Sequence, residues 1–333
     1  MKKYIYFCLS ALFLCSFSYA KEDNSWGSVY KQIKEVYIED VDVAKIAVSA
    51  LKGINLIDKN LQLADDKTRI TLYYKGKVEA VAAKPKDVND YQEWGKVTDK
   101  IIETAERVSE NFSDRSFEVD DKMAQSLLSI LDKDSEFYAS MDDVRGKMGG
   151  YKRFFAARMK DNGDLYVKIN TFNKQTYNDL KKSIDDYPNA KRLVLDVRKC
   201  PGGMVGEAIK IADLFLENGI IASTSEKKAD YFVYYNADEE KIFGAKDIEI
   251  WTDEETASAA EILAGALQEQ GRAIVRGRKT FGKGTLQKLI LLPSGSVLAV
   301  TSGYLQTPSG REININGIIP NIIEESDDWD IIN

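Results

Sequence analysis

A serine, a lysine and a pair of glycines are the residues of this 333-residue chain that could carry out chemistry. Ser258 lies within Thr256–Ile262, at the start of a predicted helix. The first turn of a helix offers free backbone N–H groups and the positive end of the helix dipole, which suit a developing oxyanion. A serine in this position is also a common helix cap. Taken alone, the segment is compatible with both roles.

Lys283 lies in the segment Gly277–Gly284, whose residues 277–283 match the G-x-x-x-x-G-K part of a phosphate-binding P-loop. However, Gly284 stands where a P-loop carries the hydroxyl that binds magnesium, and Leu286–Leu292 predicts a strand where a P-loop opens a helix. A glycine turn with a solvated lysine is a further interpretation. Nucleotide binding is therefore the weakest of our hypotheses.

The glycine pair, Gly202 and Gly203, ends the segment Asp196–Gly203, in which a buried-type strand runs into glycines and then a helix. Such a turn exposes backbone N–H groups at the carboxyl edge of a sheet, where ligands tend to bind. Tight strand-to-helix connections are, however, common in any α/β protein.

The chain contains no histidine. This excludes Ser-His-Asp and Cys-His catalysis and removes the commonest zinc ligand. Cys200 is the only cysteine after residue 20, so no internal disulfide can form there. Any nucleophilic chemistry must use another base. A lysine amine with its ordinary pKa of about 10.4 is charged at neutral pH, so a lysine base must be desolvated, and Phe281 is an apolar neighbour of Lys283.

The predicted secondary structure that must position these residues differs between the N-terminal and C-terminal parts of the chain. Apolar spacing predicts helices from residue 21 to about 65, over Trp94–Phe112 and over Asp121–Leu131. Ile70–Tyr74 and Val78–Val81 flank a Lys-Gly-Lys turn and predict a small hairpin. From about residue 165 strands alternate with helices, which predicts an α/β core with a mainly parallel sheet. The predicted divisions are a signal peptide at 1–20, a mainly helical N-terminal region at 21–150 and a core at 151–333.

Five ordered motifs together resemble those of the C-terminal processing peptidases, also called tail-specific proteases. They are Asp196–Gly203, Thr256–Ile262, Thr280–Gln287, Pro308–Arg311 and Gly317–Pro320. The spacing of 25 residues from Ser258 to Lys283 also matches that family. In addition, Leu127–Ser135 is similar to the family's L-x-x-L-D-x-x-S stretch.

The resemblance implies a β-β-α superhelical core of the type shared with ClpP and crotonase. It also implies a serine endopeptidase without a cofactor or metal, in which Ser258 attacks the scissile carbonyl and forms an acyl-enzyme. Lys283 would accept the serine proton, and Gln287 would hold the lysine amine in line. The backbone N–H groups that would form the oxyanion hole are those of Gly202, Gly203 and Ala259.

The chain departs from the family pattern in several places. Asp253–Glu255 stands where the family usually has an asparagine and a glycine, Lys199-Cys200 replaces an asparagine-rich pair, and the second serine of the motif is Ala260. About 30 residues separate Ser135 from Leu165, too few for the PDZ domain that many members carry there. The missing PDZ domain and the acidic stretch Asp253–Glu255 support the alternative of a catalytically weak or inactive binding protein with a protease fold.

The first 20 residues predict export. Lys2 and Lys3 precede an apolar run from Tyr4 to Phe17, and Ser18-Tyr19-Ala20 fits a cleavage site. We therefore expect a periplasmic or secreted protein without a stable membrane span after cleavage. The formal net charge of −7 and the lack of a basic block disfavour nucleic acid. The expected partners are a protein or peptide substrate and, through the N-terminal region, a second copy of the chain.

Overall fold

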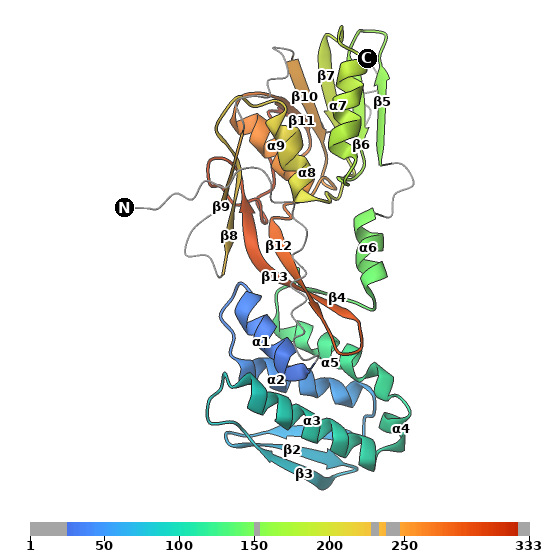
Figure 1. Ribbon diagram of the computed structural model, residues 1–333, viewed down its shortest axis with the longest axis vertical. Coiled ribbons are helices and arrows are strands. Elements are labelled where there is room, and N and C mark those ends of the chain that lie inside the picture. Colours follow the sequence, from blue (N-terminus) through green and yellow to red (C-terminus); the bar gives the residue numbers. More distant parts are fainter. Residues whose placement is uncertain (1–24, 150–153, 228–232, 238–246, 326–333) are drawn as a thin grey trace, which may run out of the picture.

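The computed structural model describes residues 25–149, 154–227, 233–237 and 247–325, so the expected signal peptide lies outside the described residues. Figure 1 shows an α/β core at one end of the long axis and a mainly helical region at the other, with a hairpin running between them. The α/β class predicted from the sequence is confirmed. Within the described residues, no helix is both long and apolar enough to cross a membrane.

The core is built on a six-stranded sheet in the order β14-β11-β10-β7-β6-β5, parallel except for the antiparallel β5–β6 pair. Leu193 and Leu195 of β7 are buried on the face that the helices cover, because alternate side chains of a strand point to opposite faces. The strands are β5 (Phe155–Met159), β6 (Leu165–Ile169), β7 (Arg192–Asp196), β10 (Asp247–Thr252), β11 (Ile274–Gly277) and β14 (Ile322–Ile323).

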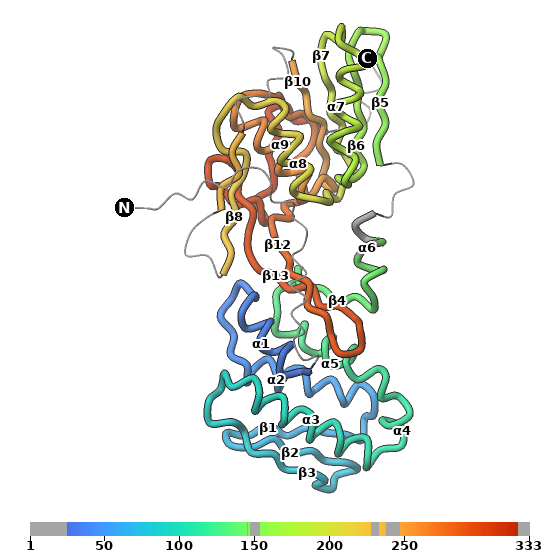
Figure 2. The backbone as a smooth tube through the Cα atoms, in the orientation of Figure 1, coloured from blue at the N-terminus to red at the C-terminus, as the bar shows by residue number. Residues whose placement is uncertain are grey.

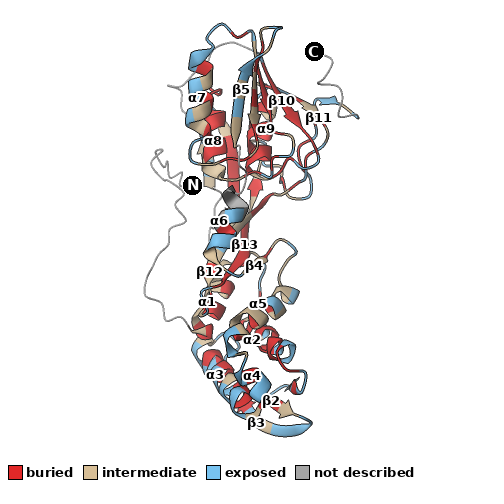
Figure 3. Cartoon of the chain, turned by 90° about the vertical axis from the view of Figure 1, so that its right-hand side faces the viewer, coloured by how far each residue is buried: buried red, intermediate tan, exposed pale blue. Residues whose placement is uncertain are grey.

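Three helices bury their apolar sides against this sheet in one continuous cluster. α9 is the most deeply buried of them, with every residue from Ala259 to Leu267 buried. α7, in contrast, keeps an exposed outer side (Figure 3). The helices are α7 (Thr176–Asp186), α8 (Val205–Asp213) and α9 (Ala259–Glu269).

A second sheet has the order β12-β13-β8-β9, and β4 pairs with the far end of β13. All of its pairings are antiparallel. The predicted pairing across the turn at Pro293–Gly295 is therefore present. The strands are β4 (Glu136–Tyr138), β8 (Ile220–Glu226), β9 (Val233–Asn236), β12 (Thr285–Leu291) and β13 (Val297–Gln306).

The helical region carries a three-stranded antiparallel sheet in which the predicted hairpin, β2 and β3, is joined by β1. We expected helix up to about residue 65, and this was wrong for β1. The Asp58 carboxylate accepts hydrogen bonds from the backbone and side chain of Asn60, and this turn ends the helical stretch. The elements are α1 (Trp26–Val36), α2 (Val43–Leu51), η1 (Lys52–Leu56), β1 (Leu61–Asp65), β2 (Arg69–Tyr74), β3 (Lys77–Ala83), α3 (Tyr91–Val108), α4 (Glu110–Ser113), η2 (Ser116–Glu118), α5 (Val119–Leu127), η3 (Leu128–Ile130) and α6 (Met141–Gly149).

The β12–β13 hairpin joins the two parts of the molecule. Figure 2 shows it leaving the core and running down to α1 and α5. Four of its apolar side chains, Ile290, Leu292, Leu298 and Val300, are buried in the same cluster as the helices of the N-terminal region. The strand that follows Lys283 is therefore anchored in both parts of the structure.

Candidate active site

Ser258 lies where β10 turns into α9, as the residue directly before the helix. Its backbone has φ +54° and ψ −118°, a conformation that costs a non-glycine residue about 1–3 kcal/mol and that clusters at functional sites. The turn is held in place because the backbone N–H of Phe281 donates to Thr256 O at 2.9 Å. The side chain of Ser258 is partly exposed, whereas the helix behind it is buried.

Gly202, the first residue of the glycine pair, packs directly against this serine. A Cβ atom on Gly202 would lie 2.8 Å from Ser258 Cβ and 2.9 Å from Ala259 N. Gly202 and Gly203 have φ values of +98° and +132°, which favour glycine. Within the described residues, the N–H groups of Gly202, Gly203 and Ala259 donate no hydrogen bond. The free donors of Gly202 and Ala259 thus lie beside the serine, and that of Gly203 follows directly in the chain.

Glu261, on the first turn of α9, ties the serine segment to the lysine segment. Its fully buried carboxylate accepts four hydrogen bonds: from Ser258 N at 2.7 Å, Lys283 N at 2.9 Å, Gly282 N at 2.7 Å and Thr280 Oγ1 at 2.5 Å. Burial raises the pKa of Glu261, and the four hydrogen bonds offset part of that effect. The backbones of Ser258 and Lys283 are therefore fixed by one carboxylate.

The side chains of Lys283 and Gln287 point to other partners. Lys283 Nζ lies 3.8 Å from Glu136 Oε1 of β4, and both side chains are about one quarter exposed. Gln287 Nε2 donates to the backbone carbonyl of Asp134. No hydrogen bond within the described residues joins Lys283 to Ser258 or to Gln287. The structure thus brings the backbones of the predicted pair together and gives the lysine amine a carboxylate partner.

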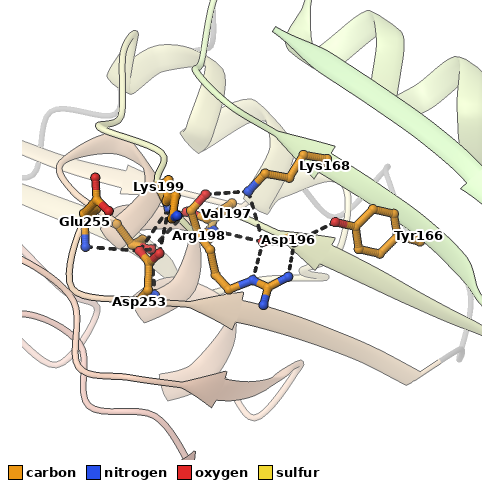
Figure 4. Close-up of polar contacts among 9 residues, drawn as sticks. Tyr166, Lys168, Asp196, Val197, Arg198, Lys199, Asp253 and Glu255 are labelled. Carbon is orange, nitrogen blue, oxygen red and sulfur yellow. Dashed lines mark hydrogen bonds and ion pairs between the residues drawn. The ribbon is translucent and has the colours of Figure 1, made fainter. Parts of the chain in front are cut away.

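The strand that leads into the glycine turn ends at a buried carboxylate, Asp196, shown in Figure 4. Asp196 accepts hydrogen bonds from Tyr166 Oη at 2.6 Å, Lys168 Nζ at 3.1 Å and Arg198 Nη2 at 2.7 Å. Burial alone would raise the pKa of this carboxyl, but the Arg198, Lys168 and Tyr166 contacts outweigh burial and hold the pKa below its usual value. This network fixes the start of the turn that carries Gly202.

Asp253, which the sequence analysis treated as a departure from the family pattern, has a structural role. Its carboxylate accepts hydrogen bonds from Lys199 N at 2.9 and 3.0 Å and from Thr256 Oγ1 at 3.1 Å (Figure 4). Lys199 has a positive φ of +56°. Asp253 therefore holds the glycine turn and the serine turn against each other. A polar residue that ends a buried strand was the only sequence signal for this role.

The structure also bears on Cys200 and on the P-loop interpretation of the Lys283 segment. Cys200 is fully buried, and burial raises the pKa of its thiol to about 12, so it is not a thiolate nucleophile at neutral pH. The segment after Lys283 forms strand β12 and opens no helix, so the P-loop interpretation is wrong. Among the described residues, no group of three or more His, Cys, Asp or Glu side chains is arranged to hold a metal ion.

Comparison with known proteins points to one family. The model of peptidase family S41 matches residues 165–323. The chain is similar to the carboxy-terminal-processing protease of Bartonella bacilliformis, with 36% identity over 51% of this chain and 41% of the relative. It is also similar to the carboxyl-terminal-processing protease of Picosynechococcus sp., with 40% identity over 46% of this chain and 37% of the relative. The chain thus spans about two fifths of the length of these relatives.

Among solved structures, a lipoprotein from Streptococcus agalactiae has a similar fold, with a TM-score of 0.52, 17% identity, and coverage of 87% of this chain and 94% of that chain. This likeness concerns the fold alone. The match to the family model covers the segments that carry Gly202, Ser258 and Lys283. We conclude that residues 165–323 of this chain belong to peptidase family S41, and that the relatives they resemble are carboxy-terminal processing proteases.

Proposed function

We propose that this chain is a serine endopeptidase that hydrolyses peptide bonds of protein substrates, with Ser258 as the nucleophile and Lys283 as the general base. The observation that carries the proposal is that the backbone N–H groups of Gly202 and Ala259 lie beside Ser258 and donate to no acceptor within the described residues. The N–H of Gly203, the next residue along the chain, is also without an acceptor there. Free backbone donors beside a nucleophile can stabilise the tetrahedral oxyanion that forms when it attacks a carbonyl.

The reaction runs in two steps. Ser258 Oγ attacks the scissile carbonyl while its proton passes to the neutral amine of Lys283, and the protonated amine then gives a proton to the leaving amine. The second step repeats this sequence with water and releases the acid product from the acyl-enzyme. General-base catalysis of this kind contributes about 10²–10⁴-fold, and one oxyanion donor contributes about 3–4 kcal/mol.

For this reaction the Lys283 amine must approach Ser258 Oγ and leave the Glu136 carboxylate, which lies 3.8 Å from it. The backbone of Lys283 is already tied to that of Ser258 through Glu261, so the movement involves the lysine side chain. Gln287 lies on the same strand, four residues later, and we propose that its amide then turns to the lysine amine. The lack of contact between the Lys283 amine and Ser258 in the free enzyme is compatible with catalysis, because catalytic contacts often tighten only in the complex with substrate.

The proposal includes the substrate class and the compartment. The two relatives are named carboxy-terminal and carboxyl-terminal processing proteases, so we propose cleavage near the C-terminus of an exported protein substrate. The apolar run at Tyr4–Phe17 supports export, and we propose that the protein acts in the periplasm or outside the cell. A homodimer through the N-terminal region stays a prediction.

Cleavage of an unfolded protein such as casein tests the proposal. We expect Ser258→Ala to abolish cleavage and Lys283→Ala to lower the rate at least about 10²-fold. The matched control is Lys279→Ala, because Lys279 is an exposed lysine in the same loop, and it should keep the wild-type rate. Undiminished cleavage by Ser258→Ala would overturn the assignment.

The second candidate function is a binding protein that keeps the protease fold without turnover. The contacts of Lys283 with Glu136 and of Gln287 with Asp134 favour it, since neither side chain is engaged with Ser258. This candidate predicts that wild type and Ser258→Ala retain casein equally in a pull-down and that neither cleaves it at any pH. Cleavage by wild type alone would exclude it.

A further inference from the structure

One segment of the N-terminal region, Asp132–Tyr138, is built onto the strand opposite β12. The Asp132 carboxylate accepts hydrogen bonds from Thr301 Oγ1 at 2.9 Å and from Ser135 Oγ at 3.0 Å, and Thr301 N donates to Ser135 Oγ at 3.2 Å. Directly after this turn, β4 pairs with β13. These contacts explain the Asp-x-x-Ser motif, because the Asp132 and Ser135 side chains hold this segment against the β12–β13 hairpin that follows Lys283.

This segment presents two acceptors to the residues proposed for proton transfer. The Glu136 carboxylate faces Lys283 Nζ at 3.8 Å, and the Asp134 carbonyl accepts from Gln287 Nε2. Glu136 also accepts a hydrogen bond from Tyr138 Oη, which fixes the orientation of the carboxylate. The polar ends of both side chains are thus engaged by one segment, seven residues long, that comes from outside the α/β core.

We propose that Glu136 is a positioning residue that holds the Lys283 amine away from Ser258, so that Asp132–Tyr138 restrains the resting enzyme. This inference rests on the proposed function of Ser258 and Lys283. A carboxylate close to an ammonium group favours the ammonium, which has no lone pair to accept the serine proton. Substrate binding or a shift of β4 that separates Glu136 from Lys283 then releases the amine.

The charged surroundings single out Glu136 for this role. Its carboxylate contacts two titratable groups, Lys283 and Tyr138, and the β13 residues that pair with β4 are the apolar Val297, Leu298 and Ala299. α6, which packs beside β4, contributes two exposed aspartates, Asp142 and Asp143. A second carboxylate, that of Glu261, accepts a hydrogen bond from the backbone N–H of Lys283.

Replacement of this carboxylate by its neutral isostere tests the inference. We expect Glu136→Gln to raise kcat/KM on casein roughly two- to fivefold at pH 7, the size expected for a partly exposed ion pair. The acid limb of the pH–rate profile should move to lower pH. The matched control is Glu226→Gln, because Glu226 forms a comparable ion pair with Lys288 of β12, at 3.2 Å, and is about as exposed as Glu136. The control should leave both readouts unchanged.

A second measurement separates this inference from the proposed function. Acetic anhydride labels only neutral amines, so the extent of Lys283 labelling against pH, read by mass spectrometry, reports its protonation without any turnover. We expect half-labelling at lower pH in Glu136→Gln than in wild type or Glu226→Gln, even if no variant cleaves casein. An unchanged labelling curve would overturn the inference. A lower kcat/KM in Glu136→Gln with an unmoved pH profile would also overturn it, because Glu136 would then support catalysis. Loss of casein cleavage in every variant with the shifted labelling curve would instead refute the proposed function alone.

Discussion

Replacing Glu261 with glutamine changes one atom of the side chain and removes half of its acceptor capacity. The carboxylate accepts two hydrogen bonds on each oxygen, from Thr280 and Gly282 on one and from Ser258 and Lys283 on the other. Glutamine keeps one carbonyl oxygen and places an NH₂ group against the two donors of the other. Each buried donor that loses its acceptor costs about 1–3 kcal/mol.

Two donors that lose their shared acceptor therefore cost about 2–6 kcal/mol. Part of this is offset because glutamine carries no charge, whereas burial disfavours the charged form of Glu261 and raises its pKa. We expect Glu261→Gln to lower the free energy of unfolding by roughly 2–4 kcal/mol. We also expect a drop in the rate of casein cleavage of at least about tenfold, because the Ser258 and Lys283 backbones are no longer tied to one group.

Urea unfolding followed by circular dichroism measures the first quantity, provided that the slope with urea is unchanged. Glu255→Gln is the control, because Glu255 is an exposed glutamate in the turn before Ser258, and it should change stability by less than about 0.5 kcal/mol. If Glu261→Gln matched this control in both stability and activity, the carboxylate would not hold the site together and our reasoning would be refuted.

Three further changes test the turns around the site. Gly202→Ala should lower the rate of casein cleavage at least about tenfold, because its Cβ would lie 2.7 Å from Ala257 O. The control Gly206→Ala finds open space and should keep the wild-type rate. Equal rates of the two variants would contradict the packing at Gly202. Asp253→Asn should destabilise the protein by about 1–2 kcal/mol in urea unfolding, since the amide keeps one acceptor for the donors that the carboxylate holds, and a smaller loss would argue against its role. The low pKa of Asp196 stabilises the folded protein above about pH 4, and this contribution is lost as the carboxyl is protonated at lower pH. The difference in unfolding free energy between wild type and Asp196→Asn should therefore shrink from pH 6 to pH 3, and a constant difference would count against the network.

The sequence predicts local patterns well in this chain. The alternation of β6, α7, β7, α8, β10 and α9 follows from apolar periodicity, and the position of Ser258 before a helix follows from the residues around it. β1 was missed because its five residues have no clear alternation, and a turn centred on Asp58 and Asn60 decides where the helical stretch ends.

The contacts that organise the site could not be predicted, because they join residues far apart in the sequence. Glu261 reads as a capping residue three positions after Ser258, but its bonds to Thr280 and Gly282 depend on how two loops meet. The pairing of Lys283 with Glu136 depends on β4 reaching β13, which no local pattern reveals. Periodicity identifies elements, whereas partners of buried charges come only from the assembled fold.

The central claim, that Ser258 forms an acyl-enzyme, is tested most directly by intact-protein mass spectrometry with a peptide p-nitrophenyl ester. Attack by Ser258 Oγ would release p-nitrophenol and leave the acyl group on the enzyme. We predict a mass increase equal to the acyl group in wild type, located by fragmentation on Ser258, and no increase in Ser258→Ala. An adduct on another residue, or the same adduct in Ser258→Ala, would contradict the account.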